Sequence, residues 1–257
     1  MLALERRNLI LEKLQEEKRV VVSELSQLYN VSEETIRRDL DKLDRDGLAT
    51  KSYGGAVIKE NTNIDLPFNV RKKRNVSGKQ KIAELVSDLI QDGEHIILDA
   101  STTAVFIAKA IKEKENLTVV TNSIEIIIEL SDVSDWNIIS SGGSLKEGYL
   151  ALVGQRAIEG LGAFNVEKAI MSCKGIDAVK GITDGNEQFS EAKRVLLKSG
   201  KKSILAVDSS KFDKIAFSKV CDLRDVDIIV TDQRPSEKWM NLFEENNVKC
   251  IYPEEPS

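Results

Sequence analysis

Six short apolar runs between residues 95 and 232 limit the fold of this chain more than any other feature. They are HIILDA at 95–100, LTVVTN at 117–122, WNIISSGG at 136–143, KAIMSC at 168–173, KSILAVD at 202–208 and DIIVTD at 227–232. Stretches of helical period, such as residues 104–114, separate several of the runs. Short buried strands joined by helical crossovers build a sheet that helices cover on both faces. The sequence therefore predicts an α/β domain over residues 79–257.

Small and polar residues follow three of these runs, where a ligand could bind. They are Asp99, Ser101, Thr102 and Thr103 after the first run, Thr121 and Asn122 after the second, and Gly142 and Gly143 after the third. In open α/β sheets, ligands bind beyond the carboxyl ends of the strands. The segment after Asp99 also opens a helix, whose N–H groups and dipole can hold a phosphate, while Asp99 can accept hydrogen bonds from sugar hydroxyls. Taken singly, each residue is better explained by a helix N-cap or a turn, but together they predict a phosphorylated ligand.

The first third of the chain begins with a pattern of short helices. Apolar spacing predicts a first helix over residues 3–18. A brief second helix follows, which we expect Ser23 to cap and which turns Leu25 and Leu28 inward. Asn30 then allows a tight turn, because asparagine tolerates the left-handed backbone conformation. The pattern predicts two helices that lead closely into a third.

The third helix has a clear start, a buried face and an end. Ser32 is placed to cap it, and two glutamates follow at the positive end of its dipole. Ile36, Leu40 and Leu43 recur at helical spacing and form one buried stripe. Gly47 suits the position just after the helix end.

The outer face of this third helix carries the arginines. With the apolar stripe inward, Thr35 and Arg38 lie on the outer side, and Arg37 lies on its flank. In a helix-turn-helix, residues at this end of the second helix of the motif reach bases and phosphates in the major groove. The alternative is a solvated helix face, on which the arginines pair with acidic residues of the same helix.

A hairpin signal follows the three helices. In LATKSYGGAV, residues 48–57, the pair Gly54-Gly55 separates two short stretches that contain apolar residues. Lys51 and Tyr53 lie just before these glycines. Three helices and a hairpin predict a winged helix-turn-helix DNA-binding domain over residues 1–58.

Charge supports a division between two domains. The first 80 residues contain 16 Lys and Arg against 13 Asp and Glu, although the whole chain has a net charge of -5. An anionic partner for the first part would explain this asymmetry. Residues 59–78 include Pro67 and the run RKKR at 71–74, and we interpret them as a basic linker. The run is either a solvated face or a contact to DNA phosphates.

The remaining composition excludes several classes of protein. The three cysteines, Cys173, Cys221 and Cys250, are odd in number and far apart, which favours reduced thiols in the cytoplasm. The one histidine, His95, has no partner at a metal-ligand spacing, so we expect no metal and no cofactor. The chain also lacks an apolar run long enough to span a membrane and a signal peptide's continuous apolar core.

The stretch VSEETIRRDLDKLDRDGLATKSYGGAV, residues 31–57, resembles the signature of the DeoR family of bacterial transcriptional regulators. In that pattern a Ser or Thr opens the recognition helix, Thr-Ile-Arg-Arg-Asp-Leu follows, and the wing carries Gly-Gly-Ala. Carried over by position, the resemblance implies a DNA-binding surface. Its residues are Ser32, Thr35, Arg37, Arg38, Lys51, Tyr53, Gly54 and Gly55. The family commonly has a basic residue or histidine near the place of Tyr53.

Residues 79–232 resemble the DeoR sensor domain, which is similar in fold to ribose-5-phosphate isomerase and glucosamine-6-phosphate deaminase. The family's strand-end motif is close to Asp-x-Gly-Ser-Thr, and this chain has Ala100-Ser101 in the middle of that motif. Further matching positions are Lys174, Glu191 and Lys211. The resemblance implies that the two lysines lie near charged or hydroxyl groups of a phosphorylated sugar or related metabolite.

We therefore expect a cytoplasmic repressor of a carbohydrate-metabolism operon. Its partners would be double-stranded operator DNA, a sugar-phosphate effector and further copies of the chain, in a dimer or tetramer. Two alternatives remain open. The second domain could be an isomerase, since Asp99, Glu191 and Lys174 are group types that enolisation uses, or it could serve only for oligomerisation.

Overall fold

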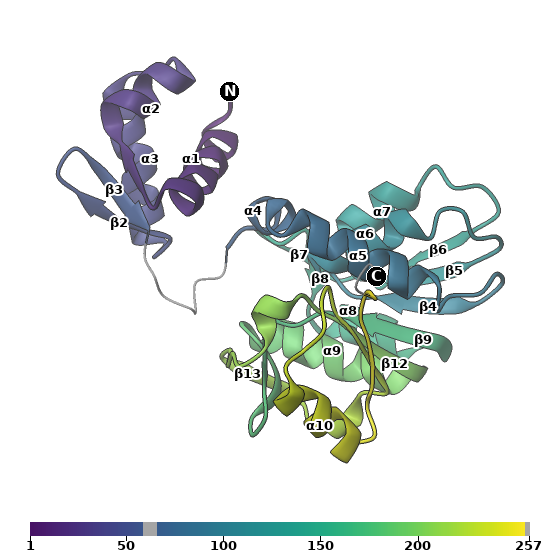
Figure 1. Ribbon diagram of the computed structural model, residues 1–257. Coiled ribbons are helices and arrows are strands. Elements are labelled where there is room, and N and C mark those ends of the chain that lie inside the picture. Colours follow the sequence, from purple (N-terminus) through teal and green to yellow (C-terminus); the bar gives the residue numbers. More distant parts are fainter. Residues whose placement is uncertain (59–65, 255–257) are drawn as a thin grey trace. The chain divides into compact units, whose positions relative to one another are not determined.

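The computed structural model in Figure 1 describes residues 1–58 and 66–254. The chain forms two compact units, residues 1–74 and 75–257, called here the N-terminal unit and the C-terminal unit. Each unit has its own hydrophobic core.

The segment predicted as a linker, residues 59–78, contains regular structure. Residues 59–65 lie outside the described part of the chain. Helix α4 (Phe68–Lys73) follows and carries the first three residues of the RKKR run. Helix α5 (Val76–Ser87) begins the C-terminal unit, so the units meet at Arg74 rather than at residue 78.

The N-terminal unit consists of helices and a small antiparallel sheet in the order β1-β3-β2. Besides α4, its elements are α1 (Ala3–Glu17), β1 (Arg19–Val21), α2 (Val22–Tyr29), α3 (Glu33–Arg45), β2 (Ala49–Ser52) and β3 (Gly55–Ile58). Ile36, Leu40 and Leu43 of α3 are buried against α1 and α2, which confirms the predicted apolar stripe. The predicted three helices and hairpin are confirmed.

Three local features fix the turn between α2 and α3 and the end of α3. Asn30 has φ +50°, the left-handed conformation that ends α2. The Ser32 hydroxyl accepts a hydrogen bond from the Thr35 N–H at 3.2 Å and caps α3. Gly47, just past the end of α3, has φ +71°. These predictions are confirmed.

Two predictions for α2 were wrong. The helix begins at Val22, because the strand β1 ends at Val21 and leaves no room for an independent cap at Ser23. Leu28 has an exposed fraction of 59%, whereas Leu25 is fully buried. The two leucines are three positions apart on a short helix, and only Leu25 belongs to the core that contains Ile36 and Leu40 of α3.

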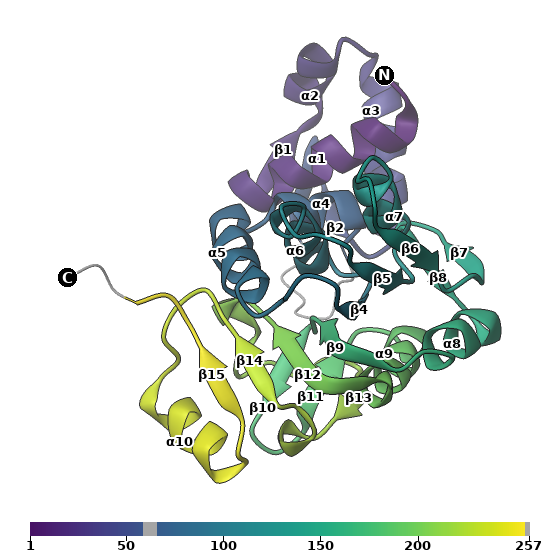
Figure 2. The same cartoon turned by 90° about the vertical axis from the view of Figure 1, so that its right-hand side faces the viewer.

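The C-terminal unit is built on a seven-stranded parallel sheet in the order β15-β14-β12-β9-β4-β5-β6 (Figure 2). The strands are β4 (His95–Leu98), β5 (Thr118–Thr121), β6 (Asn137–Ser140), β9 (Val166–Met171), β12 (Gly200–Ala206), β14 (Ile228–Val230) and β15 (Lys249–Ile251). All six predicted strands are present. The chain runs outward from β4 through β5 to β6 and then returns to β9 on the other side of β4. The strand order therefore reverses between β4 and β9.

Helices cover both faces of this sheet, as predicted (Figures 1 and 2). The helices α5, α6 (Thr102–Ala110) and α7 (Ile124–Leu130) lie on one face, and α8 (Gln155–Gly162), α9 (Glu187–Ser199) and α10 (Glu237–Glu245) lie on the other. Right-handed crossovers place helices on opposite faces when the strand order reverses. Two 3₁₀ turns, η1 (Ser209–Lys211) and η2 (Leu223–Asp225), complete the helical elements of the described residues.

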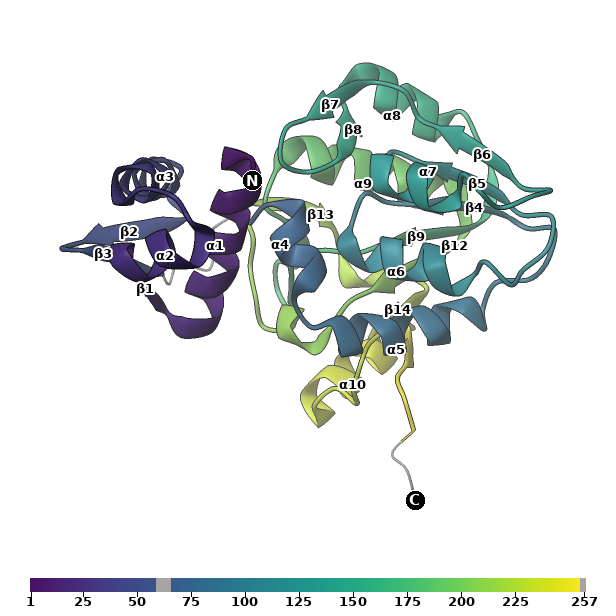
Figure 3. The ribbon, with the colours of Figure 1, turned by 90° about the horizontal axis from the view of Figure 1, so that it is seen from above.

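Two small antiparallel sheets were not predicted from the sequence. The hairpin of β7 (Ser144–Lys146) and β8 (Ala151–Val153) lies beside the start of α8 (Figure 3). The second sheet has the order β10-β11-β13, with β10 (Gly175–Asp177), β11 (Gly181–Asp184) and β13 (Ser218–Cys221).

Asn75, the first residue of the C-terminal unit, is hydrogen-bonded to Asp232, which lies late in that unit's sequence. The Asn75 amide donates to Asp232 at 3.1 Å, and the other carboxylate oxygen of Asp232 accepts the Ser209 N–H at 2.7 Å. Gly78 lies directly beneath this contact, and a Cβ there would be 2.6 Å from the Asp232 carboxylate. A larger residue at this position would therefore displace the Asn75 and Asp232 side chains from their contact.

Candidate DNA-binding surface and ligand site

The arginines of α3 are exposed and paired within their own helix. Arg37 Nη2 lies 2.6 Å from Glu33, and Arg38 Nε lies 3.3 Å from Glu34. These are the intrahelical pairs of the alternative interpretation. Exposed pairs of this kind contribute only about 0.3–0.5 kcal/mol. The guanidinium groups can therefore exchange a glutamate for a phosphate or a base at little cost.

Ser32 and Thr35 lie together at the start of α3. Their hydroxyl oxygens are 2.9 Å apart, and Ser32 also caps the helix. Both hydroxyls are at the positive end of the helix dipole, where an anion is favoured. The predicted surface residues Ser32, Thr35, Arg37 and Arg38 thus occupy one end of one helix.

The aspartate of the Thr-Ile-Arg-Arg-Asp-Leu motif has a role that the sequence analysis missed. Asp39 is buried and forms an ion pair with Arg6 of α1, with Nε and Oδ2 2.5 Å apart. Both side chains are more than nine-tenths buried. The pair connects α1 to the middle of α3. Its two residues are 33 positions apart in the chain, so no local spacing signals the pairing.

The hairpin carries the remaining predicted residues of this surface. Lys51 forms an ion pair with Asp41 of α3, and Tyr53 is fully exposed at the tip. Gly54 has φ +78°, a conformation that favours glycine. The Gly54 carbonyl accepts the Val22 N–H at 2.8 Å and so connects the tip to α2.

Gly55 differs from the other predicted surface residues. It is buried, and a Cβ at Gly55 would lie 2.0 Å from the Val20 carbonyl oxygen. Glycine is required there because β3 and β1 approach closely. Gly55 shapes the hairpin and does not offer a surface for contact, which corrects its assignment.

In the C-terminal unit, the reversal of strand order marks the expected place of a ligand. Asp99 follows β4 and Ser172 follows β9, the two strands at the reversal. One Asp99 oxygen accepts the Ser101 N–H at 3.1 Å, and the other accepts the Ser172 N–H at 3.1 Å. The buried carboxylate therefore joins both strand ends and is engaged by the protein itself. This corrects its predicted role as an acceptor for sugar hydroxyls.

A buried lysine compensates the charge of Asp99. Lys193 of α9 lies 3.3 Å from Asp99, forms an ion pair with Asp184 of β11, and donates to the Ser172 carbonyl at 2.7 Å. Burial alone would lower the pKa of Lys193, but the two carboxylates raise it. Burial would raise the pKa of Asp184, and Lys193 lowers it. We call Asp99, Asp184 and Lys193 the buried triad; the sequence analysis did not predict that these three side chains pair.

The start of α6 lies next to the triad. Ser101 is its N-cap and accepts the Ala104 N–H at 3.1 Å, so the hydroxyl of Ser101 is used within the protein. Thr102 and Thr103 are the first residues of the helix, where N–H groups have no partner within the helix. The helix dipole and the N–H groups at these two positions are suited to hold an anion.

Thr121 and Asn122 at the end of β5 differ in whether their side chains have hydrogen-bond partners for all their polar atoms. Thr121 donates its hydroxyl to the Leu98 carbonyl at 2.7 Å and accepts the Ser123 N–H, so it supports the sheet rather than a ligand. Asn122 donates its amide to Leu152 of β8 at 3.1 Å. Its Oδ1 atom is buried and accepts no hydrogen bond from the residues that the structure describes.

Three further predicted residues lie at the edge of this region. Gly142 and Gly143 follow β6 with φ +68° and +108°, and a Cβ at Gly143 would collide with β8 and α8. Lys211 follows β12 and lies 3.0 Å from Asp208 and 2.9 Å from the Ser210 hydroxyl. The two glycines and Lys211 therefore follow strands on opposite sides of the reversal, since β9, β4 and β5 lie between β12 and β6.

Glu191 does not join the site. It is exposed on α9, two positions before the buried Lys193. Residues two apart on a helix face nearly opposite directions, so Glu191 points away from the strand ends. Its predicted place among the effector-binding residues was wrong.

The sequence analysis missed a pair of aromatic side chains that packs beside the end of β4. Tyr149 and Phe189 lie with ring centroids 4.9 Å apart and pack with Ala100, next to the start of α6. The Lys174 ammonium is 5.9 Å from the centroid of Tyr149. Burial lowers the pKa of Lys174 to about 8, opposed by the nearby Asp184. Lys174 therefore lies beside the aromatic pair, and its lowered pKa means that its ammonium loses its proton more readily than that of an exposed lysine.

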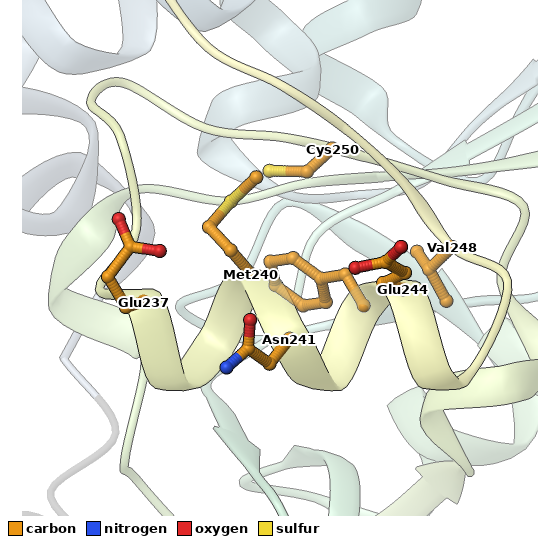
Figure 4. Close-up of a pocket in the computed structure, with 7 residues that line it drawn as sticks. Glu237, Met240, Asn241, Glu244, Val248 and Cys250 are labelled. Atoms are coloured by element: carbon orange, nitrogen blue, oxygen red, sulfur yellow. The ribbon is translucent and has the colours of Figure 1, made fainter.

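A separate hollow lies at the other edge of the sheet (Figure 4). Met240 and Phe243 of α10 and Val248 and Cys250 near β15 form its apolar part, and Glu237, Asn241 and Glu244 line the rest. It contains no residue of the strand ends at the reversal. The predicted ligand chemistry therefore lies elsewhere.

The chain matches two sequence families, one in each unit. The DeoR-like helix-turn-helix domain matches residues 6–62, and the DeoR C terminal sensor domain matches residues 74–233. The chain belongs to the DeoR family. It is a DNA-binding transcriptional regulator and not an enzyme, and its C-terminal unit is the sensor unit.

DeoR-type regulators match along both units. The chain is 38% identical over 249 residues to the HTH-type transcriptional regulator YulB of Bacillus subtilis, covering 97% of this chain and 96% of that protein. It is 33% identical over 246 residues to the HTH-type transcriptional repressor GlcR of Bacillus subtilis, covering 96% and 95%. Ribose 5-phosphate isomerase A of Methanocaldococcus jannaschii overlays 54% of this chain and 55% of its own, with 14% identity and a TM-score of 0.40.

The described residues also bear on membrane and metal sites. Across residues 1–58 and 66–254, no helix combines the length and apolar composition needed to cross a bilayer. The same residues contain no group of His, Cys, Asp or Glu placed to hold a metal ion. The three cysteines are free, and burial raises the pKa of each thiol to about 12.

Proposed function

We propose that this DeoR-family regulator is a cytoplasmic repressor of a carbohydrate-metabolism operon, released from its operator by a phosphorylated sugar. The observation that carries the proposal is the start of α6 at the reversal of strand order. Thr102 and Thr103 begin that helix, and Asp99 joins the two strand ends beneath it. A phosphate there would meet backbone N–H groups and the positive end of the helix dipole.

The N-terminal unit supports the DNA-binding part of the proposal. Thr35, Arg37 and Arg38 are within the first half of α3 and outside its buried stripe, with Arg37 on the flank of the outer face. Lys51, Tyr53 and the exposed Gly54 of the hairpin would contact the adjacent backbone, as in winged helix-turn-helix proteins. Arg37, Arg38 and Lys51 each pair with an acidic side chain, and on DNA binding they would exchange these partners for phosphates.

Two features support a phosphorylated rather than a neutral effector. Lys174 and Lys211 follow β9 and β12, on the same side of the reversal. Asp208 already pairs with Lys211, so a phosphate would compete with a carboxylate for that ammonium. A neutral sugar carries no charge with which to compete for this ammonium. The repressor GlcR among the relatives supports repression as the mode of action.

The proposed mechanism couples the two sites through the arrangement of subunits. Two or more copies of the chain would occupy repeated operator half-sites. The effector would favour an arrangement with poorer half-site spacing. A coupling free energy of about 1–3 kcal/mol, typical of such linkage, would change operator affinity roughly 5- to 150-fold.

The test is fluorescence anisotropy with labelled DNA from upstream of the protein's own gene, at fixed salt with excess nonspecific competitor. A panel of sugar phosphates is added beside the parent sugars. Release by one phosphate and not by its parent sugar supports the proposal. Specific binding that no phosphate changes would contradict the effector part and favour a sensor unit that only oligomerises.

A pair of variants then locates the effector. Thr102→Ala removes a hydroxyl at the start of α6 and should weaken the response while leaving DNA binding unchanged. Ser236→Ala removes a hydroxyl at the start of α10 and serves as the matched control. An undiminished response in Thr102→Ala would exclude the phosphate position at α6.

A further inference from the structure

The amide of Asn122 has one half satisfied and one half unsatisfied. Asn122 has an exposed fraction of 3%. Its Nδ2 donates to the Leu152 carbonyl at 3.1 Å, and its backbone carbonyl accepts the Leu152 N–H at 2.7 Å. Oδ1 is buried and has no hydrogen-bond partner within the described part of the chain. Asn122 therefore holds an acceptor that the protein does not use.

The orientation of this amide is fixed by its neighbour. The Leu152 carbonyl can only accept a hydrogen bond, so the NH₂ group must face it. Rotating the amide by half a turn would place two oxygens against each other. Oδ1 therefore faces away from β8.

The two sequence neighbours of Asn122 both have hydrogen-bonded side chains, so the unpaired oxygen belongs to Asn122 and not to the whole segment. Thr121 before it makes two hydrogen bonds with its hydroxyl, and Ser123 after it accepts the Ile126 N–H at 3.3 Å. An unpaired buried acceptor costs about 1–3 kcal/mol, and such atoms are rare in folded proteins. A donor from a ligand would remove this cost.

Asn122 lies next to the proposed phosphate position. Leu98 is opposite Thr121 in the parallel pair of β4 and β5, so Asn122 is opposite Asp99, one strand spacing away. Leu152, its partner, lies between Ala151 and Val153, which pack with Ala100. The unsatisfied oxygen and the start of α6 thus belong to the same corner of the sheet.

We propose that Asn122 Oδ1 accepts a hydrogen bond from a hydroxyl of the effector, beside the phosphate held at the start of α6. This rests on the proposed function and narrows it to a class of ligand: a phosphorylated sugar or polyol with a free hydroxyl close to its phosphate. A phosphorylated acid that presents a carboxylate at the same place is rejected, because two acceptors repel. Asn122 is then a residue that determines specificity.

The test uses two probes and one replacement. The probes are inorganic phosphate and the sugar phosphate that releases DNA most effectively in the anisotropy panel, measured by calorimetry on the full chain. Asn122→Leu keeps the size of the side chain and removes the acceptor. We expect a loss of at least about tenfold in affinity for the sugar phosphate, the effect of an unmade hydrogen bond, and inorganic phosphate affinity within about twofold of the parent.

Deoxy analogues of the sugar phosphate identify the hydroxyl. The parent protein should bind the analogue that lacks the contacting hydroxyl about tenfold more weakly, and Asn122→Leu should show no further loss with that analogue. Thr231→Val, at the buried end of β14, is the matched control and should leave both probes unchanged. Where Asn122→Leu does not fold, Asn122→Ala replaces it, since alanine also removes the acceptor and is smaller than asparagine.

Each outcome bears on a different statement. Equal binding of the sugar phosphate by Asn122→Leu and the parent overturns the role of Asn122 and leaves the phosphate position intact. Weakened binding of both probes also overturns it, because the residue would then only support the fold of the site. A parent protein that binds neither probe overturns the effector proposal itself and this inference with it.

Discussion

The outer face of α3 and the strand ends of the sensor unit both pair cationic side chains with carboxylates, but the pairs differ in burial. Arg38 and Glu34 have side chains exposed by 78% and 62%. Lys193 and Asp99, by contrast, are exposed by 11% and 3%. An exposed pair is weak and can be exchanged for another anion, whereas a buried pair fixes the backbone groups around it. The first suits a surface that must contact DNA, and the second suits a site that must hold its shape.

The largest effect is expected from breaking the buried triad. Lys193→Met leaves Asp99 and Asp184 buried without a compensating charge, which should reduce the free energy of unfolding by about 3–5 kcal/mol. Urea unfolding of the full chain measures this. Lys219→Met, which removes one side of an exposed pair with Asp222, should change stability by less than about 0.5 kcal/mol. Similar values for the two variants would refute the contrast between buried and exposed pairs.

The buried Arg6–Asp39 pair of the N-terminal unit tests whether the contribution of an ion pair to stability depends on its burial rather than on the unit in which it lies. Asp39→Ala leaves Arg6 buried and unpaired, and we expect a loss of about 3 kcal/mol in the stability of that unit. Operator affinity should fall as well, because α1 no longer supports α3. The control is Asp41→Ala, whose partner Lys51 is exposed. If Asp39→Ala unfolds no more easily than the control, the pair does not hold α3.

Replacing the exposed Arg38 should affect DNA binding more than stability. Arg38→Ala should lower specific operator affinity by about 1–3 kcal/mol if the side chain contacts a base. Its stability should change by less than about 0.5 kcal/mol. Lys42→Ala breaks an equivalent exposed pair with Asp46 at the other end of α3 and should leave affinity nearly unchanged. Anisotropy at fixed salt compares the two, and equal affinities would remove Arg38 from the surface.

The smallest effect is expected from pH. Burial lowers the pKa of Lys174 to about 8 from 10.5. If its charge assists the phosphate, the affinity for inorganic phosphate should fall up to about tenfold between pH 7 and 9, as the ammonium loses its proton. Lys174→Met should flatten this profile. A parent profile that is already flat would place Lys174 outside the site.

Stability should respond to the same lysine with the opposite slope. Between pH 8 and 10.5 the unfolded chain binds more protons at Lys174 than the folded chain does. The free energy of unfolding should therefore gain a contribution that increases with pH across this window. Comparing the parent with Lys174→Met by urea unfolding at several pH values isolates that contribution.

Much of the fold could be predicted from the sequence because its strands are continuous apolar runs. The runs at β4, β5 and β12 are buried on both faces and need no partner to be recognised. The strands β7 and β10 could not be found in this way. They have three residues each, such as SLK and GID, and form only because a neighbouring strand supplies their hydrogen bonds.

The candidate site was less predictable than the fold. Strand-end position placed Asp99 beyond β4, but it could not show that the Ser172 N–H from another strand would occupy its second oxygen. Lys193 lies far along the chain from Asp99, and its burial depends on how α9 packs. Burial of this kind is decided by long-range packing, which spacing along the chain does not encode.

The contact between Asn75 and Asp232 has a practical meaning for exchanging domains among DeoR regulators. A cut after Arg74 leaves Asn75, Gly78 and the whole of α5 with the sensor, which then keeps every hydrogen bond of that contact. Helix α4 stays with the N-terminal unit, where Val70 packs against Leu11. A cut after residue 78, where the sequence suggested the boundary, would divide α5 and transfer both Asn75 and Gly78 to the wrong partner. Chimeric regulators built at the first junction should inherit an intact sensor.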